Sequence, residues 1–250
     1  MTLQEFFHNN PRAALAFSGG ADSAYLLWAA REWAEDVKAY YVHSPFQPAF
    51  ELADARRLAE ELHMPMAVLE ADVLSVPGAA ANGPDRCYHC KTALFTLLKE
   101  AALADGYTLL IDGTNASDDA GDRPGMRALA ELAVRSPLRE CGVTKAEVRA
   151  RSREAGLFTW DKPAYACLAT RVPTGTAITP EALSAVEGAE KALAALGYRD
   201  FRVRLFHGAA RLELTERDFA RAAGAREAVK AALSPWFETV LLDFTVRTGG

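Results

Sequence analysis

The stretch that decides the fold is Leu15-Ala16-Phe17-Ser18-Gly19-Gly20-Ala21-Asp22-Ser23, where a short apolar run meets two glycines and then a helical pattern. Residues 13–17 have strand character, and from Ala24 onward the apolar residues recur at helical spacing. Glycines let the main chain approach an anion closely, and the free N–H groups at the start of the following helix point at it. The sequence therefore predicts an anion-binding turn between a strand and a helix.

A turn capped by Ser or Asp would also explain a Gly-Gly pair, so the signal depends on the whole string. S-G-G-x-D-S after an N-terminal strand resembles the PP-loop of the ATP pyrophosphatases and matches neither G-x-x-x-x-G-K-S/T nor G-x-G-x-x-G. The resemblance implies that ATP binds, that a substrate is adenylated, and that AMP and pyrophosphate leave. It also implies nucleotide contacts from Ser18, Gly19, Gly20, Asp22 and Ser23. Asp22 is a candidate Mg²⁺ ligand, although an acidic residue in a first turn also has a capping role.

Composition bounds the class of protein. Half of the 250 residues are hydrophobic, which suits one large domain or two small ones. No segment approaches the roughly 18 apolar residues of a bilayer span, and the first residues lack the pattern of a signal peptide. We therefore expect a soluble, cytoplasmic protein with no membrane partner. A net charge of −5 argues against contact with nucleic acid and favours a small-molecule substrate.

Over the first two thirds, short apolar runs alternate with helical patterns, which is typical of a parallel sheet wrapped by helices. Strands are predicted near residues 13–17, 37–42, 66–70 and 108–111. Helices are predicted near residues 21–34, 49–62, 91–104, 124–132 and 144–155, the last with a capping box of Thr144 and Glu147. Ligands bind beyond the carboxyl ends of such strands. Thr114 and Asn115 follow the fourth strand there and are predicted nucleotide contacts.

The pattern changes near residue 172, where Pro173 and Gly175 interrupt it. We predict a helix near 179–196, strands near 200–206 and 210–215, a helix near 216–232 and a strand near 239–246. The predicted fold class is α/β. It has a PP-loop parallel-sheet domain over residues 1–171 and a smaller α+β domain for substrate binding and assembly over residues 172–250.

Cys87 and Cys90 have C-x-x-C spacing just before the third predicted helix. Four cysteines in a cytoplasmic chain of this size are no disulfide framework, so this pair points to metal or redox chemistry. The helix dipole, Arg86 and Lys91 favour the thiolate, which binds metal or attacks electrophiles. Two partly buried thiols without a function would give the same spacing. Cys167 is a third thiol, in a loop-like stretch that also fits a buried linker cysteine.

Further strings resemble the successive signatures of the LarE-type sulfur transferases, a PP-loop family. They are Arg86-Cys87-Tyr88-His89-Cys90-Lys91, Asp112-Gly113-Thr114-Asn115, Arg135-Ser136-Pro137-Leu138, Thr144-Lys145-Ala146-Glu147-Val148-Arg149, Lys162-Pro163 through Arg171, Leu242-Asp243-Phe244 and Arg247-Thr248-Gly249. The resemblance covers nearly the whole chain. It implies a homo-oligomer that acts on pyridinium-3,5-biscarboxylic acid mononucleotide. A ring carboxylate would be adenylated and converted to a thiocarboxylate of the nickel-pincer cofactor of lactate racemase.

The resemblance leaves two sources of sulfur open. In one branch of the family a cysteine at the position of Cys167 gives up its own sulfur and becomes dehydroalanine. In the other, three cysteines hold a [4Fe-4S] cluster whose open iron carries the extra sulfide, and Cys87, Cys90 and Cys167 match them. We favour the cluster, because all three thiols are present. Cys141 has no matching role.

Arg202 and Arg204 alternate on a predicted strand, so both guanidinium groups would emerge on one face. An exposed strand edge often carries such charges, but planar donors also suit a phosphate. We predict both as substrate contacts, with Arg171 facing the substrate phosphate or the nucleotide.

The alternatives are a tRNA thiolation enzyme, an amidotransferase-type synthetase and a non-enzymatic nucleotide-binding module. The acidic balance argues against tRNA. A synthetase would not explain Cys167 beside the C-x-x-C pair, and a binding module would need no thiols.

Overall fold

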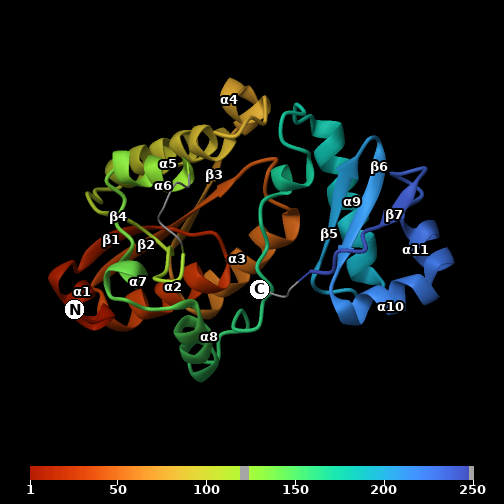
Figure 1. Ribbon diagram of the computed structural model, residues 1–250. Helices are drawn as coiled ribbons and strands as arrows, with labels where there is room; N and C mark the ends of the chain where they lie inside the picture. Colours follow the sequence, from red (N-terminus) through yellow and green to blue (C-terminus); the bar gives the residue numbers. More distant parts are fainter. Residues whose placement is uncertain (119–123, 248–250) are drawn as a thin grey trace.

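The computed structural model describes residues 1–118 and 124–247, which form two sheets surrounded by helices (Figure 1). The first sheet is parallel and has the order β3-β2-β1-β4. Its strands are β1 (Arg12–Ala16), β2 (Asp36–His43), β3 (Met66–Glu70) and β4 (Leu110–Asp112). The second sheet has the order β5-β6-β7, with strands β5 (Phe201–Phe206), β6 (Ala209–Leu214) and β7 (Val240–Leu242). The predicted fold class is confirmed.

Helices cover both faces of the parallel sheet, which is why most residues of its strands are apolar and the charged ones lie mainly at the strand ends. On one face, Leu15 of β1 shares a core with the helices α1 (Leu3–Asn9), α2 (Ala21–Trp33), α3 (Ala49–Glu61) and α8 (Lys145–Glu154). On the other face, Ala14 of β1 packs in a core with α5 (Arg86–Ala104), against which α6 (Pro124–Glu131) lies. The alternation of Ala14 and Leu15 therefore joins the sheet to both helix layers.

The small sheet packs one face against α9 (Pro180–Ala195), and Figure 1 shows the two sheets side by side. Its core also contains residues from the first part of the chain: Phe46, Val73 of the 3-10 turn η1 (Val73–Ser75) and Ala79 of α4 (Pro77–Ala80). Leu168 of η2 (Leu168–Arg171) joins them. The predicted limits 1–171 and 172–250 stay a prediction, and the two parts share packed side chains across them.

Some predicted elements differ in their ends. Helix α5 begins at Arg86 rather than near residue 91, so Cys87 and Cys90 lie inside its first turns. The helix predicted at 216–232 is divided at Ala225 into α10 (Glu216–Gly224) and α11 (Arg226–Leu233). Helices α1 and α7 (Pro137–Glu140) were not predicted. The capping box that opens α8 is confirmed, since Thr144 and Glu147 exchange both hydrogen bonds.

Within the described ranges, no helix combines the length and the apolar content that crossing a membrane requires. Thr248 and Gly249 of the last family signature lie outside these ranges.

We expect Gly113→Ala to destabilise the protein, because a Cβ at this position would lie 2.8 Å from the backbone nitrogen of Ser23. The neighbouring atom is backbone and cannot rotate away, and overpacking of this kind costs about 1–3 kcal/mol. Urea unfolding followed by circular dichroism measures the change. Gly83→Ala is the matched control, since a Cβ there meets no heavy atom within 4 Å. Equal midpoints for the two variants would contradict this close approach.

Candidate functional site

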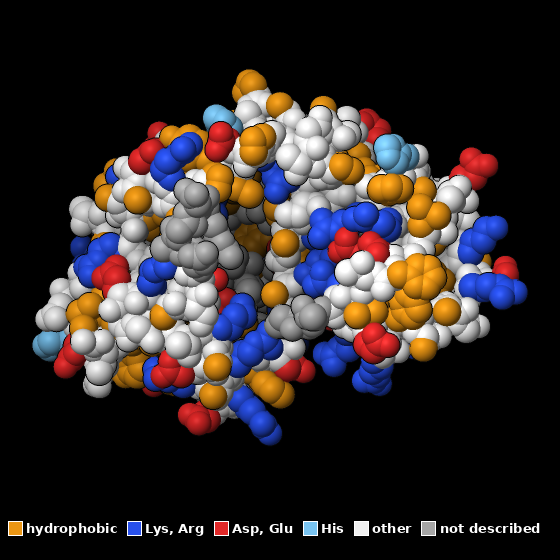
Figure 2. All heavy atoms as spheres, viewed as in Figure 1, with side chains coloured by type: hydrophobic (Ala, Val, Ile, Leu, Met, Phe, Trp, Pro, Cys, Tyr) orange, Lys and Arg blue, Asp and Glu red, His pale blue; other side chains and the backbone are white. Residues whose placement is uncertain are grey.

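A cavity of about 490 Å³ lies at the carboxyl ends of β1, β2 and β4. Its lining comes from the loop after β1, the ends of β2 and β4, the first turns of α5, the start of α8 and residues 162–167. Figure 2 shows a hollow at the centre of the molecule with Lys and Arg side chains around its border. The topology therefore gathers residues from distant parts of the sequence at one edge of the sheet.

The loop of residues 18–23 turns tightly from β1 into α2. Gly19 has a φ of +72°, in the left-handed region that favours glycine. The hydroxyls of Ser18 and Ser23 lie 3.0 Å apart, and Ser23 Oγ donates to the carbonyl of Gly20 at 3.2 Å. Ser18, Gly20, Asp22 and Ser23 line the cavity, whereas Gly19 shapes the turn and packs toward α3.

The loop after β4 packs directly on this turn. Asp112 is buried and accepts hydrogen bonds from the hydroxyls of Thr114 and Ser136, both at 2.6 Å. Thr114 lines the cavity. Asn115 is fully buried and is not part of the lining; its Oδ1 accepts from the amide of Ser117 at 2.8 Å. Thr114 is thus placed to touch a ligand, while Asn115 holds the turn that presents it.

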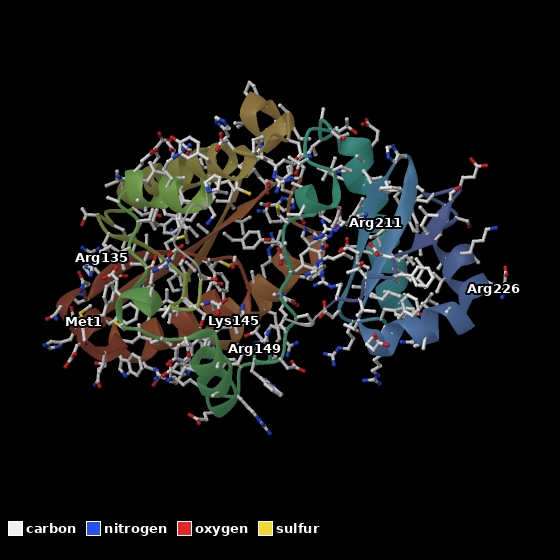
Figure 3. All side chains as sticks on the ribbon, viewed as in Figure 1. Met1, Arg135, Lys145, Arg149, Arg211 and Arg226 are labelled. Carbon is white, nitrogen blue, oxygen red and sulfur yellow. The ribbon has the colours of Figure 1, made fainter. Side chains whose placement is uncertain are left out.

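Two lysines of the lining bind residues of the first loop and its surroundings. Lys145, at the start of α8, donates to Asp22 Oδ2 at 3.2 Å and lies at the centre of the molecule in Figure 3. Asp22 Oδ1 is buried and has no hydrogen-bond partner among the described residues. Lys162 donates to Asp54 at 2.7 Å and to the Gly19 carbonyl at 3.3 Å. Both ammonium groups therefore add positive charge beside the anion-binding turn.

The thiols of Cys87, Cys90 and Cys167 line this same cavity. Burial, together with the nearby thiols of Cys167 and Cys87, raises the pKa of Cys90 to about 12. Burial also raises the pKa of Cys167. The guanidinium of Arg86 lies 3.6 Å from Cys87 Sγ. Three thiols from α5 and the segment before η2 thus converge, whereas Cys141 packs apart from them, against the core of α1 and α2.

Among residues 1–118 and 124–247, no three His, Cys, Asp or Glu side chains are grouped closely enough to hold one metal ion. In a [4Fe-4S] cluster each cysteine binds a different iron. Three thiols that surround one space can therefore hold a cluster even where they are too far apart to bind one metal ion together. The donor set of Cys87, Cys90 and Cys167, which all line one cavity, fits this requirement in its chemistry.

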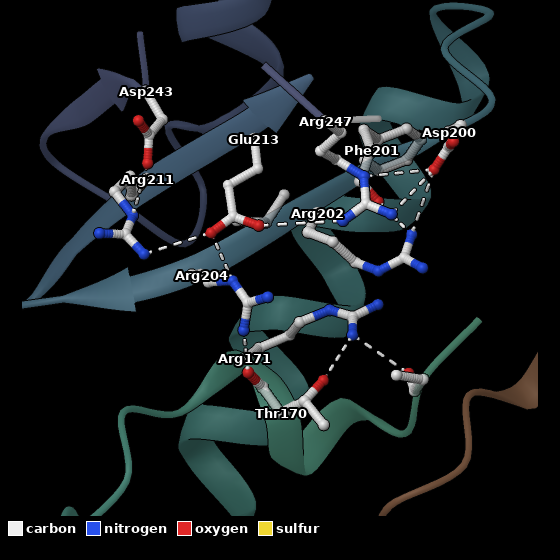
Figure 4. Close-up of polar contacts among 12 residues, drawn as sticks. Thr170, Arg171, Asp200, Phe201, Arg202, Arg204, Arg211, Glu213, Asp243 and Arg247 are labelled. Carbon is white, nitrogen blue, oxygen red and sulfur yellow. Dashed lines mark hydrogen bonds and ion pairs between the residues drawn. The ribbon is translucent and has the colours of Figure 1, made fainter. Parts of the chain in front are cut away.

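The arginines predicted as substrate contacts lie behind the cavity rather than in its lining. Arg171 is 1% exposed and donates to Glu190 Oε1 at 2.7 Å. Burial and the charges of Arg171 and Arg247 lower the pKa of Arg202 to about 10. Arg204 donates to Glu213 and to the carbonyl of Thr170 (Figure 4). The three side chains are brought together, but much of their donor capacity is used within the protein.

Sequence reasoning missed one further acidic residue of the lining. Glu51 lies in the first turn of α3, and burial raises the pKa of its carboxyl group to about 7 against the opposing effect of Lys162. The hydroxyl of Tyr41 faces the same region and, like Asp22 Oδ1, is buried without a hydrogen-bond partner in the described part of the chain. No local pattern marks Glu51, because its surroundings come from other elements.

No family model matches the chain. An uncharacterised protein of Synechocystis sp. is 40% identical over 213 residues, which are 85% of this chain and 80% of that protein. The pyridinium-3,5-bisthiocarboxylic acid mononucleotide synthase of Lactiplantibacillus plantarum is 35% identical over 217 residues, covering 86% of this chain and 79% of the synthase. A Methanocaldococcus jannaschii protein is 28% identical over 214 residues. Given the identity and coverage shared with the synthase, the chain belongs to the LarE family.

Proposed function

We propose that the protein is an ATP-dependent sulfur transferase that adenylates a carboxylate of pyridinium-3,5-biscarboxylic acid mononucleotide and converts it to a thiocarboxylate. The observation that carries the proposal is the convergence of an S-G-G-x-D-S turn and three thiols on one cavity. The name of the Lactiplantibacillus plantarum relative supports the substrate class. Membership of this family favours the proposal over tRNA thiolation and over an amidotransferase-type synthetase.

The nucleotide would bind at residues 18–23 and at the loop after β4. Backbone amides at the start of α2 would face its phosphates. Lys145 and Lys162 would offset the negative charge that develops as pyrophosphate leaves. Asp22 Oδ1 has the free electron pairs that a Mg²⁺ ligand needs. Adenylation itself makes chemical sense because a carboxylate oxygen is a poor leaving group and AMP is a good one.

The substrate phosphate would bind Arg171, Arg202 and Arg204 from the small domain. A guanidinium has five N–H donors, so an arginine that already binds the protein retains others for an anion. Burial and then the charges of Arg171 and Arg247 lower the pKa of Arg202, and a bound phosphate would offset this neighbouring positive charge. The homo-oligomer implied by the family stays a prediction.

Cys87, Cys90 and Cys167 would hold the cluster, which when bound would supply sulfide without consuming the protein. If Cys167 is itself the donor, its sulfur attacks the adenylate, AMP leaves, and the Cβ–S bond breaks as a base removes the Cα proton. In that case the product takes the sulfur and Cys167 becomes dehydroalanine. In the Cys167 route the thiol and the Cα each lose a proton inside the cavity, and Glu51 is placed there to accept one of them.

Asp22→Ala and Ser23→Ala should lower the rate of AMP and pyrophosphate formation by about 100-fold or more, since both remove groups that face the phosphates. Chromatography of the nucleotide products measures the rate, and thermal melting checks that both variants fold. Asp36→Asn, in the surface pair of Asp36 with Arg12, is the control for loss of one acid. Release of ADP and orthophosphate by the wild-type protein would contradict adenylation.

Anaerobically purified protein should contain iron and sulfide and absorb broadly near about 400 nm. Cys87→Ser, Cys90→Ser and Cys167→Ser should each lose this absorption, and Cys141→Ser should keep it. Iron-free protein that transfers sulfur once and loses roughly 34 Da, the mass of H₂S, would instead make Cys167 the donor.

Glu51→Gln should stabilise the ligand-free protein more at pH 8 than at pH 4. Burial raises the folded-state pKa to about 7, above the ordinary glutamate value of 4.5, so the stability that the protonated group contributes is lost as the pH rises between these two values. The gain at pH 8 is at most about 3 kcal/mol. Urea unfolding at both pH values measures it, with Glu100→Gln on α5 as the control for one lost charge. An equal effect of Glu51→Gln at both pH values would refute the assignment.

A further inference from the structure

The segment of residues 164–171, here called the Cys167 loop, is held by arginines along its length. Four of its backbone carbonyls each accept a hydrogen bond from a different guanidinium group. The pairs are Arg202 with Ala164, Arg171 with Ala166 at 3.1 Å, Arg86 with Ala169 at 3.1 Å, and Arg204 with Thr170. Two of these carbonyls precede Cys167 and two follow it, so the thiol lies at the centre of the clamped segment.

Main-chain hydrogen bonds contribute little to the first half of the loop, which Tyr165 also anchors through its hydroxyl bond to Glu190. Ala164 and Ala166 are exposed, and no helix or strand forms before η2 begins at Leu168. The main-chain bonds near the thiol run from Leu168 N to the Phe46 carbonyl at 2.8 Å and from Thr170 N to the Cys167 carbonyl at 3.0 Å. Exposed main chain with few bonds opens readily. Hydrogen bonds from charged donors, which are stronger than neutral ones, compensate for this.

The arginines are themselves fixed by partners outside the loop. Arg204 is held by Glu213, which also binds Arg211 at 3.2 Å (Figure 4). Arg86 donates at 2.6 Å to Asn82, which is fully buried and whose side-chain amide reaches the carbonyls of Val172, Pro173 and Thr176. A guanidinium that is already ordered loses little freedom when it binds a carbonyl.

We propose that Arg86 and Arg204 are positioning residues that set where Cys167 lies in the cavity. Arg86 reaches the loop from α5, the helix that carries Cys87 and Cys90, and Arg204 reaches it from β5 of the small domain. The spacing of the three thiols therefore depends on both arginines. The meaning of this spacing for sulfur transfer rests on the proposed function, whereas the clamp itself is a property of the chain.

Hydrogen–deuterium exchange with mass spectrometry on the full-length, nucleotide-free protein tests the clamp. In Arg86→Gln and Arg204→Gln, peptides over residues 164–171 should exchange at least tenfold faster than in the wild type. Arg211→Gln is the matched control, because Arg211 lies on the same sheet face and binds Glu213 and Asp243. Exchange in this variant should equal that of the wild type, as should exchange in β1 of every variant. Unchanged exchange in the loop, or faster exchange over the whole chain, would overturn the proposal.

Kinetics separate positioning from a purely structural role. With the mononucleotide substrate at saturating concentration, both Gln variants should slow single-turnover sulfur transfer at least tenfold while the KM for ATP in pyrophosphate release changes less than twofold. Arg204→Lys, which can restore one hydrogen-bond donor, should recover part of the protection of residues 164–171 from exchange and part of the sulfur-transfer rate. Faster loop exchange without slower transfer would overturn the role in spacing the thiols. A wild-type protein that releases no pyrophosphate would refute the proposed function, and the exchange result would still decide the clamp.

Discussion

The buried ion pair between Arg171 and Glu190 is the interaction on which the arrangement of the two parts depends. Glu190 of α9 accepts from Arg171 Nε at 2.7 Å, from the hydroxyl of Tyr165 and from the amide of Val203 at 3.0 Å. One carboxylate thus joins the Cys167 loop, η2, α9 and β5. Breaking a buried pair by removing one partner typically costs about 3–5 kcal/mol, because a charge is left uncompensated. The loop, the small sheet and the cavity wall therefore form one connected structure.

Local patterns were sufficient for the parallel sheet and for the first binding loop. Strand and helix periods predict β1, α2 and their order, and the glycine pair predicts the left-handed turn that Gly19 adopts. The Thr144 capping box likewise marks the start of α8 within one residue. A second capping box, of Thr2 with Glu5, begins α1. It gives the same kind of sequence signal, although we did not predict that helix. These features depend on residues that are close together in the sequence, so local sequence patterns can predict them.

Contacts between residues far apart in the sequence could not be predicted from such local patterns. The alternation of Arg202 and Arg204 correctly places both on one strand, but it does not show that their donors reach carbonyls of residues 164 and 170. Lys145 and Asp22 are 123 positions apart, so their ion pair follows from the fold alone. The start of α5 was predicted near residue 91, whereas the helix begins at Arg86 and both cysteines are helical. The hydrogen bonds and ion pairs that build the site thus follow from the tertiary structure and not from local sequence patterns.

The core of the small domain has a consequence for synthesis of the protein. Phe46, Val73 and Ala79 belong to that core, yet the residues of α9 and β5 that cover them follow roughly a hundred positions later in the chain. At about 5–20 residues per second, translation leaves these side chains uncovered for on the order of ten seconds. The nascent chain therefore exposes an apolar patch beside an already foldable parallel sheet. This interval is the period in which a chaperone, or a second nascent chain, competes with α9 for the same surface.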